Sequence, residues 1–311
     1  MTHSQSVPAA RNDVSGGTAA SRPSATTALA APLNAMSVDV EDYFQVSAME
    51  PVVDRADWDG YGSRVMRNVE AVLDLFARHD TQATFFILGW VAERYPGLVR
   101  RIAEAGHEVA SHGMAHYRVS SQTPEEFRED VRRAKAVIED AGGVPVRGYR
   151  AASFSLDAST GWAHTILRDE GYGYSSSIYP IRHDHYGMPN APRGAFAPLE
   201  SPDFLEIPIS TVEIAKYRFP CGGGGYFRLL PYRLSERALR RVNTKDAMPG
   251  VFYFHPWEID PDQPRIPGLG RRTRFRHYTN LSRMEGRLER VLEAFSWSRI
   301  DRVFLGDEVT G

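Results

Sequence analysis

Hydrophobic positions recur with helical spacing in three long segments of the chain. In 64–79, 123–143 and 282–295 they return every three or four residues, which places them on one face of a helix. The second segment also opens like a helix, because Thr123 is followed by a proline and then, three residues on, by Glu126. The pattern therefore predicts three amphipathic helices. The expected buried stripes are Val65, Val69, Val72, Leu73 and Phe76 in the first, and Phe127, Val131, Ala134 and Ile138 in the second.

Short runs rich in β-branched and aromatic residues indicate strands between and after these helices. Strand and helix alternate several times along the chain, which predicts an α/β fold with a mostly parallel sheet. The segment 261–278 is rich in Gly, Pro and Arg, and we expect it to form a long surface loop. The predicted strands lie within 36–40, 81–90, 107–112, 146–154, 174–180, 204–211 and 251–256, and further helices within 92–106 and 157–172.

Composition separates the start of the chain from the rest. Residues 1–34 are rich in Ala, Ser, Thr, Pro and Gly, so we expect a disordered tail before a single domain at 35–311. The tail lacks the features of a signal peptide, and no segment approaches the roughly 20 apolar residues of a membrane span. This favours a cytoplasmic location, while a membrane-proximal location and an unusual export route stay open. The single cysteine, Cys221, excludes an intrachain disulfide, and the net charge of −2 does not favour a nucleic-acid partner.

Polar side chains follow four of the predicted strands at the point where each strand ends. Acids follow the first strand and two histidines the third, while an arginine and a further histidine follow later strands. Because the carboxyl ends of parallel strands meet at one edge of a sheet, we expect these side chains to converge on a common site. They are Asp39, Glu41, Asp42, His112, His116, Arg150 and His255.

The spacing within this set suits a metal site. His112 and His116 share a face if a helical turn begins between them, and neutral imidazoles are common ligands of divalent metals. Asp39 and Glu41 share a face if the first strand continues, so this segment is able to supply a third ligand and a general base.

Simpler interpretations stay open. The histidine spacing arises by chance, and acids at a strand end are turn residues or helix caps. His255 is then only a buried, hydrogen-bonded histidine, and Arg150 only a salt-bridge residue.

Four short motifs in this order resemble those of a known family. SVDVED, SHGMAH, YRAASF and FYFHP are similar to the motifs of the NodB-type polysaccharide deacetylases, carbohydrate esterase family 4. Longer stretches are similar to the members associated with exosortase and exopolysaccharide gene clusters. These are VDVEDYFQVSAME, ATFFILGWVAERYP, GGGGYFRLLPY and FYFHPWEIDPDQPRI. The resemblance covers nearly all of the chain from about residue 36 to residue 300.

The resemblance implies a fold and an activity. The fold is a distorted (β/α) barrel with a mostly parallel sheet, its active site at the C-terminal rim of the strands, and a C-terminal extension at about 256–311. The activity is metal-dependent hydrolysis of N-acetyl groups on the amino sugars of an exopolysaccharide or its precursor, with release of acetate. The implied partners are an N-acetylated polysaccharide or oligosaccharide and the exopolysaccharide synthesis machinery.

The resemblance also assigns roles to particular residues. It matches Asp39 to the general base, Arg150 to the arginine that orients this base, and His255 to the general acid. His112 and His116 match the two metal-binding histidines. A backbone N–H just after the arginine is expected to help stabilise the oxyanion.

The resemblance leaves the third metal ligand open. It is either Glu41, on the face of the general base, or Asp42 after a bulge. The implied metal is a single divalent ion, Zn²⁺, with Co²⁺ and Ni²⁺ as alternatives. We expect Phe154, Tyr253 and Trp257 to contact the substrate.

Two positions depart from the family pattern and keep other functions open. Ala152 stands where the family usually has proline, and Ser175 stands where related proteins usually have aspartate. Because a fold does not fix a substrate, a small cyclic amide is an alternative substrate, as in the allantoinase-like relatives. A protein that binds carbohydrate without catalysis is the other alternative.

Overall fold

The computed structural model covers the 311-residue chain, and the structure describes residues 32–183, 187–200 and 202–306. The tail predicted at 1–34 lies almost wholly outside these residues, and Asn34 already belongs to the first strand. No helix of the described part is long and apolar enough to cross a membrane.

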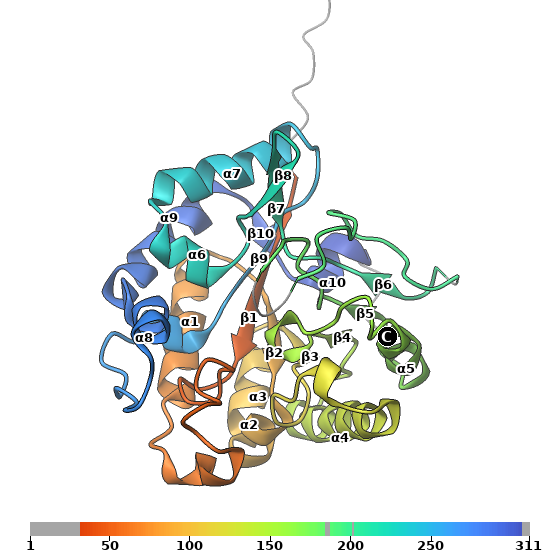
Figure 1. Ribbon diagram of the computed structural model, residues 1–311, viewed down its shortest axis with the longest axis vertical. Coiled ribbons are helices and arrows are strands. Elements are labelled where there is room, and N and C mark those ends of the chain that lie inside the picture. The colour runs from red at the N-terminus through yellow and green to blue at the C-terminus, as the bar shows by residue number, and fades with distance from the viewer. Residues whose placement is uncertain (1–31, 184–186, 201, 307–311) are drawn as a thin grey trace, which may run out of the picture. The chain divides into compact units, whose positions relative to one another are not determined.

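A parallel sheet forms the centre of the fold (Figure 1). Its strand order is β10-β1-β2-β3-β4-β5-β6, with β9 also paired to β1, and each of these ladders is parallel. The predicted parallel α/β sheet is therefore confirmed. The strands are β1 (Asn34–Val40), β2 (Thr84–Ile87), β3 (Glu108–Ser111), β4 (Gly148–Tyr149), β5 (Tyr174–Ser175), β6 (Leu205–Glu206), β9 (Val251–Phe254) and β10 (Trp297–Ser298).

Helices occupy most of the connections between the strands. The three predicted amphipathic helices are confirmed as α1 (Val65–Arg78), α4 (Pro124–Gly142) and α9 (Met284–Ala294). The capping box predicted from Thr123 and Glu126 is present at the start of α4. The other helices are α2 (Gly89–Arg94), α3 (Pro96–Glu104), α5 (Trp162–Asp169), α6 (Gly224–Leu229), α7 (Tyr232–Thr244), α8 (Arg271–Tyr278) and α10 (Ile300–Phe304).

Several segments differ from the sequence-based expectations. The strands predicted at 146–154, 174–180 and 204–211 are only two residues long, as β4, β5 and β6. The strand predicted at 81–90 ends at Ile87, because residues from Gly89 onward begin α2.

The segment 261–278, expected to be a loop, contains helix α8. Apolar periodicity could not reveal this helix, because its Arg-rich sequence has no apolar stripe. Its C-terminal carbonyls instead accept hydrogen bonds from the buried Arg228, which lies far away in the sequence.

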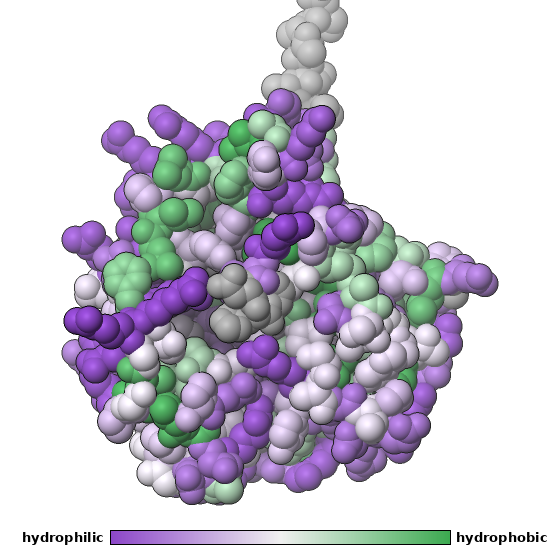
Figure 2. Space-filling view, in the orientation of Figure 1, coloured by the Kyte–Doolittle hydropathy of each residue, from purple (hydrophilic) through white to green (hydrophobic). Residues whose placement is uncertain are grey.

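An antiparallel hairpin lies outside the main sheet. It comprises β7 (Thr211–Ile214) and β8 (Tyr217–Pro220), and its partner residues include Ile214 with Tyr217. Both of these side chains are exposed, whereas Val212 is buried. Hydrophobic residues gather on the viewed face over this hairpin and the neighbouring α7 (Figure 2).

Side chains on the strands alternate between two environments. In β1, Met36, Val38 and Val40 belong to the large core packed with the helices. Ala35 belongs to a second core cluster, and the side chains of Ser37 and Asp39 bond to Arg150, which follows β4. Because β1 and β4 are not neighbours in the sheet, this contact requires the sheet to curl around an interior. Alternate residues of each strand therefore face either the interior or the helices.

A buried carboxyl group lies in this interior at the start of β3. Glu108 accepts hydrogen bonds from the hydroxyls of Thr84 and Tyr174, at 2.5 and 2.8 Å, and from the backbone N–H of Asp301 at 3.2 Å. Burial, together with the nearby charge of Asp301, raises the pKa of Glu108 to about 8. The neutral acid is therefore the form that suits the folded protein.

We expect this carboxyl group to make stability depend on pH. Between about pH 5 and pH 8, folded Glu108 holds a proton that the unfolded chain has released, so the free energy of unfolding falls as pH rises. Glu108→Gln mimics the neutral acid and should reduce this fall by more than about 1 kcal/mol. Denaturant unfolding of both proteins at several pH values measures the difference, and parallel curves would contradict the expectation.

Candidate active site

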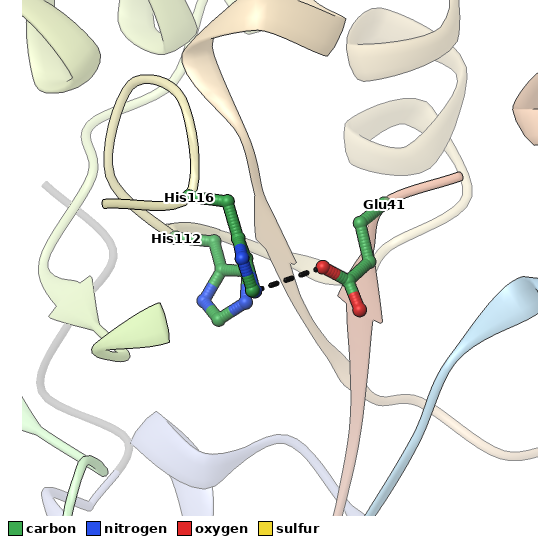
Figure 3. Close-up of side chains that lie close together, drawn as sticks. All are labelled: Glu41, His112 and His116. Carbon is green, nitrogen blue, oxygen red and sulfur yellow. Dashed lines mark ion pairs between the residues drawn. The ribbon is translucent and has the colours of Figure 1, made fainter. Parts of the chain in front are cut away.

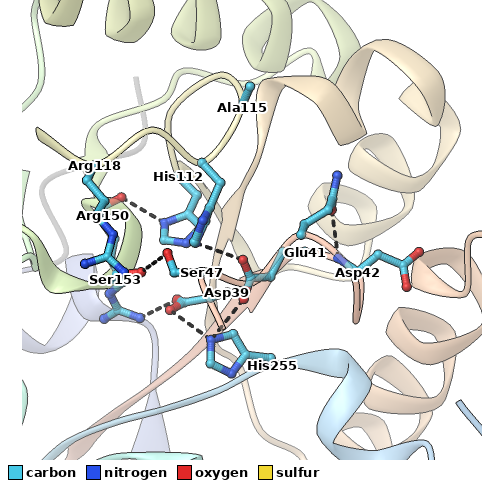
Figure 4. A network of polar contacts seen from close by, with 12 residues as sticks. Asp39, Glu41, Asp42, Ser47, His112, Ala115, Arg118, Arg150, Ser153 and His255 are labelled. Atoms are coloured by element: carbon cyan, nitrogen blue, oxygen red, sulfur yellow. Dashed lines mark hydrogen bonds and ion pairs between the residues drawn. The ribbon is translucent and has the colours of Figure 1, made fainter. Parts of the chain in front are cut away.

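The predicted polar residues lie close together just beyond the C-terminal ends of the strands (Figure 4). They continue the alternation by which every second side chain of a strand faces the interior of the sheet. Glu41 lies two residues beyond Asp39, in step with the interior side chains of β1. His112 follows Ala110 of β3 in the same way, and His255 follows Tyr253 of β9. The residues expected to converge on one rim thus do so, and the site lies at the C-terminal edge of the sheet.

Three of these side chains form a cluster suited to a metal ion (Figure 3). One ligand atom from each of Glu41, His112 and His116 lies within 4.8 Å of the others. His116 Nε2 lies 3.0 Å from Glu41 Oε2, and all three residues are buried. Two imidazoles and one carboxylate are a ligand set that binds Zn²⁺ and similar divalent ions.

The backbone around the histidines aims their rings at this cluster. The Nδ1 of His112 lies 2.8 Å from the carbonyl oxygen of Arg150, so the tautomer that donates this hydrogen bond leaves Nε2 free for a ligand. His116 has a positive φ of 56°, an uncommon conformation for a side chain of this size. The turn at His116 therefore brings its ring back toward His112, with 5.3 Å between the ring centroids.

Some polar atoms of the cluster make no well-aligned hydrogen bond with their neighbours, so they are available to bind a cation. Within the described residues, Glu41 Oε2 and His116 Nδ1 are buried without a well-aligned hydrogen bond. Burial by itself raises the pKa of Glu41. The neighbouring histidines, His116 above all, lower this pKa by more, so that it falls to about 2 overall. The carboxylate is therefore ionised, and its Oε2 is 3.0 Å from His116 Nε2 without a well-aligned hydrogen bond, so a bound metal ion would give this oxygen a partner.

Asp42 accepts hydrogen bonds at the start of α1, unlike its neighbour Glu41, which faces the histidines. Its Oδ2 accepts hydrogen bonds from the Ser63 hydroxyl and from the backbone N–H groups of Arg64 and Val65, at 2.7, 2.7 and 3.1 Å. These donors lie at the start of α1, which an acceptor there stabilises. Of the two open alternatives for the third ligand, the structure brings Glu41 to the histidines and turns Asp42 toward this helix.

Asp39 is held by a buried arginine. Arg150 Nη1 donates to Asp39 Oδ1 at 2.6 Å and to the Ser37 hydroxyl at 2.9 Å. Its remaining nitrogens donate to Ser176, through Nε to the carbonyl oxygen and through Nη2 to the hydroxyl. Arg150 is fully buried, so it fixes the position of the carboxylate while leaving Asp39 Oδ2 unengaged by its guanidinium.

His255 lies on the opposite side of the two acids. Its Nε2 is 3.3 Å from Glu41 Oε1 and 3.9 Å from Asp39 Oδ2, while its Nδ1 is 2.9 Å from Glu258 Oε1. Burial lowers the pKa of His255, but the hydrogen bond to Glu258 and the charge of Glu41 raise it to about 9 overall. The ring is thus poised to carry a proton on Nε2.

A cavity of about 360 Å³ opens onto these groups. Phe154, Tyr253 and Trp257, predicted to contact the substrate, all line it. The rings of Phe154 and Tyr253 meet edge to face, with 4.7 Å between their centroids, and Trp257 stacks on His255. The cavity therefore combines an aromatic wall with the polar cluster, as sites for small polar ligands commonly do.

The structure adds three details of the site that the sequence did not reveal. Glu258 and its partner Arg228 are buried beside His255, and the only local signal was a glutamate three residues after the histidine. The backbone N–H of Ala151, expected to contact an oxyanion, instead donates to the Ser177 hydroxyl at 2.8 Å. That same hydroxyl accepts a hydrogen bond from the Ser175 hydroxyl at 2.7 Å, so Ser175 takes part in this local network.

Two family models match adjoining parts of the chain. Residues 59–174 match the model described as polysaccharide deacetylase. This part of the chain is therefore similar to the polysaccharide deacetylases. Residues 176–305 match a second model, described as a domain of unknown function, DUF3473. The polysaccharide deacetylase match contains the two clustered histidines and Arg150, whereas the second match contains His255 and Glu258.

Curated relatives are similar to shorter stretches of the chain. A peptidoglycan-N-acetylglucosamine deacetylase, PgdA, of Listeria monocytogenes is 39% identical over 88 residues, 28% of this chain and 18% of that protein. A chitooligosaccharide deacetylase of a Bradyrhizobium species is 40% identical over 96 residues, 31% of this chain and 42% of that protein. The aligned segments thus span less than half of either relative.

Solved structures extend the similarity of fold beyond the aligned segments. A candidate polysaccharide deacetylase from Mycobacterium smegmatis has a TM-score of 0.57 at 18% identity, over 90% of this chain and 88% of that chain. The predicted fold class, an α/β barrel-like fold with a curled, mostly parallel sheet, is confirmed by this neighbour and by the strand order.

Substituting the two neighbouring acids separates their tasks. Asp42→Ala leaves buried N–H groups at the start of α1 without an acceptor and should lower the free energy of unfolding by about 1–3 kcal/mol. Glu41→Gln should fold as stably as the parent in the presence of a chelator but lose its affinity for Zn²⁺. Thermal unfolding and calorimetric titration with Zn²⁺ test both, and loss of Zn²⁺ affinity in well-folded Asp42→Ala alone would reverse the assignment.

Proposed function

We propose that this chain is a metal-dependent hydrolase that removes N-acetyl groups from amino sugars of a polysaccharide or its precursor. The observation that carries the proposal is the meeting of a three-residue metal cluster, an arginine-bound aspartate and a histidine at one cavity. The curated relatives, which are named as deacetylases of peptidoglycan and of chitooligosaccharides, supply the class of substrate.

Glu41, His112 and His116 would hold the metal, for which we propose Zn²⁺, with Co²⁺ or Ni²⁺ as alternatives. A divalent ion there supplies Lewis acidity to the acyl carbonyl and to water. Asp39 is the proposed general base, and it accepts a proton on Oδ2 because Arg150 already occupies Oδ1. His255 is the proposed general acid.

Asp39 and His255 are placed for the two proton transfers that amide hydrolysis requires. Water that attacks the acyl carbon loses a proton to Asp39, and the amine that leaves gains one from Nε2 of His255. Both groups face the same cavity, with 3.9 Å between His255 Nε2 and Asp39 Oδ2. An amine is a poor leaving group without a proton donor, so a base and an acid on one cavity are what this reaction needs.

The finer substrate assignment rests on the sequence motifs. We propose that the amino sugars belong to an exopolysaccharide, because GGGGYFRLLPY and FYFHPWEIDPDQPRI are similar to segments of deacetylases from exopolysaccharide gene clusters. Both segments lie within residues 176–305, the part matched by the second family model. Phe154, Tyr253 and Trp257 are the proposed contacts for the sugar.

The proposed reaction predicts that substituting the two clustered histidines removes both the bound metal and the release of acetate. The parent protein should hold about one equivalent of divalent metal and release acetate from N-acetylated oligosaccharides, whereas His112→Ala/His116→Ala should do neither. His79→Ala is the control, because His79 follows α1 and precedes β2, at the opposite edge of the sheet. Elemental analysis and an acetate assay measure the two properties. A parent protein that takes up no metal, even after reconstitution, would contradict the proposal.

Asp39→Asn should separate chemistry from metal binding. The amide retains the size of the side chain but accepts no proton, so kcat should fall by at least about 100-fold. The metal content should stay at the parent level, because Asp39 is not among the clustered ligands. Acetate release at saturating substrate and elemental analysis provide the two readouts. An unchanged kcat would remove Asp39 from the reaction.

A further inference from the structure

One edge of the His255 ring lies against a buried carboxylate. Glu258 Oε1 lies 2.9 Å from His255 Nδ1, and it also accepts the backbone N–H of His255 at 3.1 Å. Glu258 is fully buried, so its charge needs compensation inside the protein. A single carboxylate oxygen therefore fixes both the backbone and the ring of the histidine.

Arg228 of α6 provides this compensation and fixes the second oxygen of Glu258. Its Nε donates to Glu258 Oε2 at 2.6 Å, and Arg228 itself is buried. Its Nη1 donates to the carbonyl oxygens of Thr279 and His277, at 2.6 and 3.1 Å. The end of α8 thus holds the arginine, the arginine holds the carboxylate, and the carboxylate holds His255.

The glycine-rich segment before Arg228 makes room for this carboxylate. A Cβ at Gly224 would lie 2.3 Å from Glu258 Oε1 and 2.9 Å from Oε2, which is too close for any side chain. A Cβ at the next residue, Gly225, would have no atom within 4 Å. Of these two glycines, only Gly224 is therefore required by the position of Glu258.

Stacked rings fix the plane of the histidine as well. Trp257 stacks on His255 with 5.1 Å between centroids and 20° between planes. His277 of α8 also stacks on Trp257, with 4.2 Å between centroids and 14° between planes. The histidine therefore has both its hydrogen-bond direction and its ring plane set by neighbours.

We propose that Glu258, held by Arg228, is a positioning residue for His255. It keeps a proton on Nδ1, so that Nε2 faces the cavity, Glu41 and Asp39 and is the nitrogen that delivers a proton to the leaving amine. This proposal rests on the proposed function. It also gives a task to the segment that matches the domain of unknown function, which contains Arg228, Glu258 and His255: it builds the proton-donor side of the site.

A matched pair of glycine substitutions tests the proposal without removing any charge. Gly224→Ala pushes a methyl group against the Glu258 carboxylate and should lower kcat at least about 10-fold with little change in KM. Gly225→Ala, one residue away in the same helix, should keep the parent kcat. Thermal unfolding confirms that both variants are folded. Equal kcat values in folded Gly224→Ala and Gly225→Ala would overturn the proposal.

A double-mutant cycle distinguishes positioning from a general structural role. Glu258→Gln should lower kcat in the parent but have no further effect in His255→Ala, because its contribution passes through the histidine. Losses that multiply in the double variant would show that Glu258 acts independently of His255 and would overturn the proposal. If Glu258→Gln fails to fold, because Arg228 is left unpaired, the Gly224→Ala comparison carries the test.

An experiment without substrate separates this inference from the proposed function. In protein with ¹⁵N-labelled histidine, the His255 signal, assigned by its loss in His255→Ala, should show a protonated Nδ1 in the parent. Gly224→Ala should shift this signal, and Gly225→Ala should leave it unchanged. A parent that releases no acetate but shows this pattern retains the positioning and loses only the proposed function. An unprotonated Nδ1 in the parent would overturn the positioning itself.

Discussion

The guanidinium of Arg150 is buried in the interior of the curled sheet, and the geometry of the site depends on how its charge is satisfied. Its hydrogen bonds reach Asp39 and Ser37 on β1 and Ser176 just after β5. A buried cation of this kind is tolerated only with an anion and a full set of acceptors. The pair with Asp39 therefore ties non-neighbouring strands together across the interior and fixes the carboxylate at the rim.

The same residue also links the two chemical parts of the site. The carbonyl oxygen of Arg150 lies 2.8 Å from His112 Nδ1, so the backbone at this point sets the direction of the His112 ring while the side chain sets that of Asp39. On the far side of the cavity, His255 depends on a second buried ion pair, Arg228 with Glu258. The cavity thus lies between two buried arginine–carboxylate pairs, each of which orients one polar group.

Much of the framework could be predicted because its signals are local. The helical stripes of α1 and α4 and the capping box of α4 depend on residues three or four apart, which are neighbours on a helix. Helix α8 and the hairpin β7–β8 could not be found in this way. Helix α8 has no apolar stripe, and its end is held by Arg228 from another segment.

The sequence by itself determined which residues share a face and which strand ends carry chemistry. Its two-residue alternation already placed Glu41 in step with Asp39, but a bulge would have brought Asp42 forward instead. Only the tertiary structure separates the two acids: Asp42 accepts hydrogen bonds from backbone N–H groups at the start of α1, whereas Glu41 turns to the histidines. Tertiary structure alone also revealed Glu258 and Arg228 behind His255, since 30 residues separate that pair and no local spacing connects groups that meet only through folding.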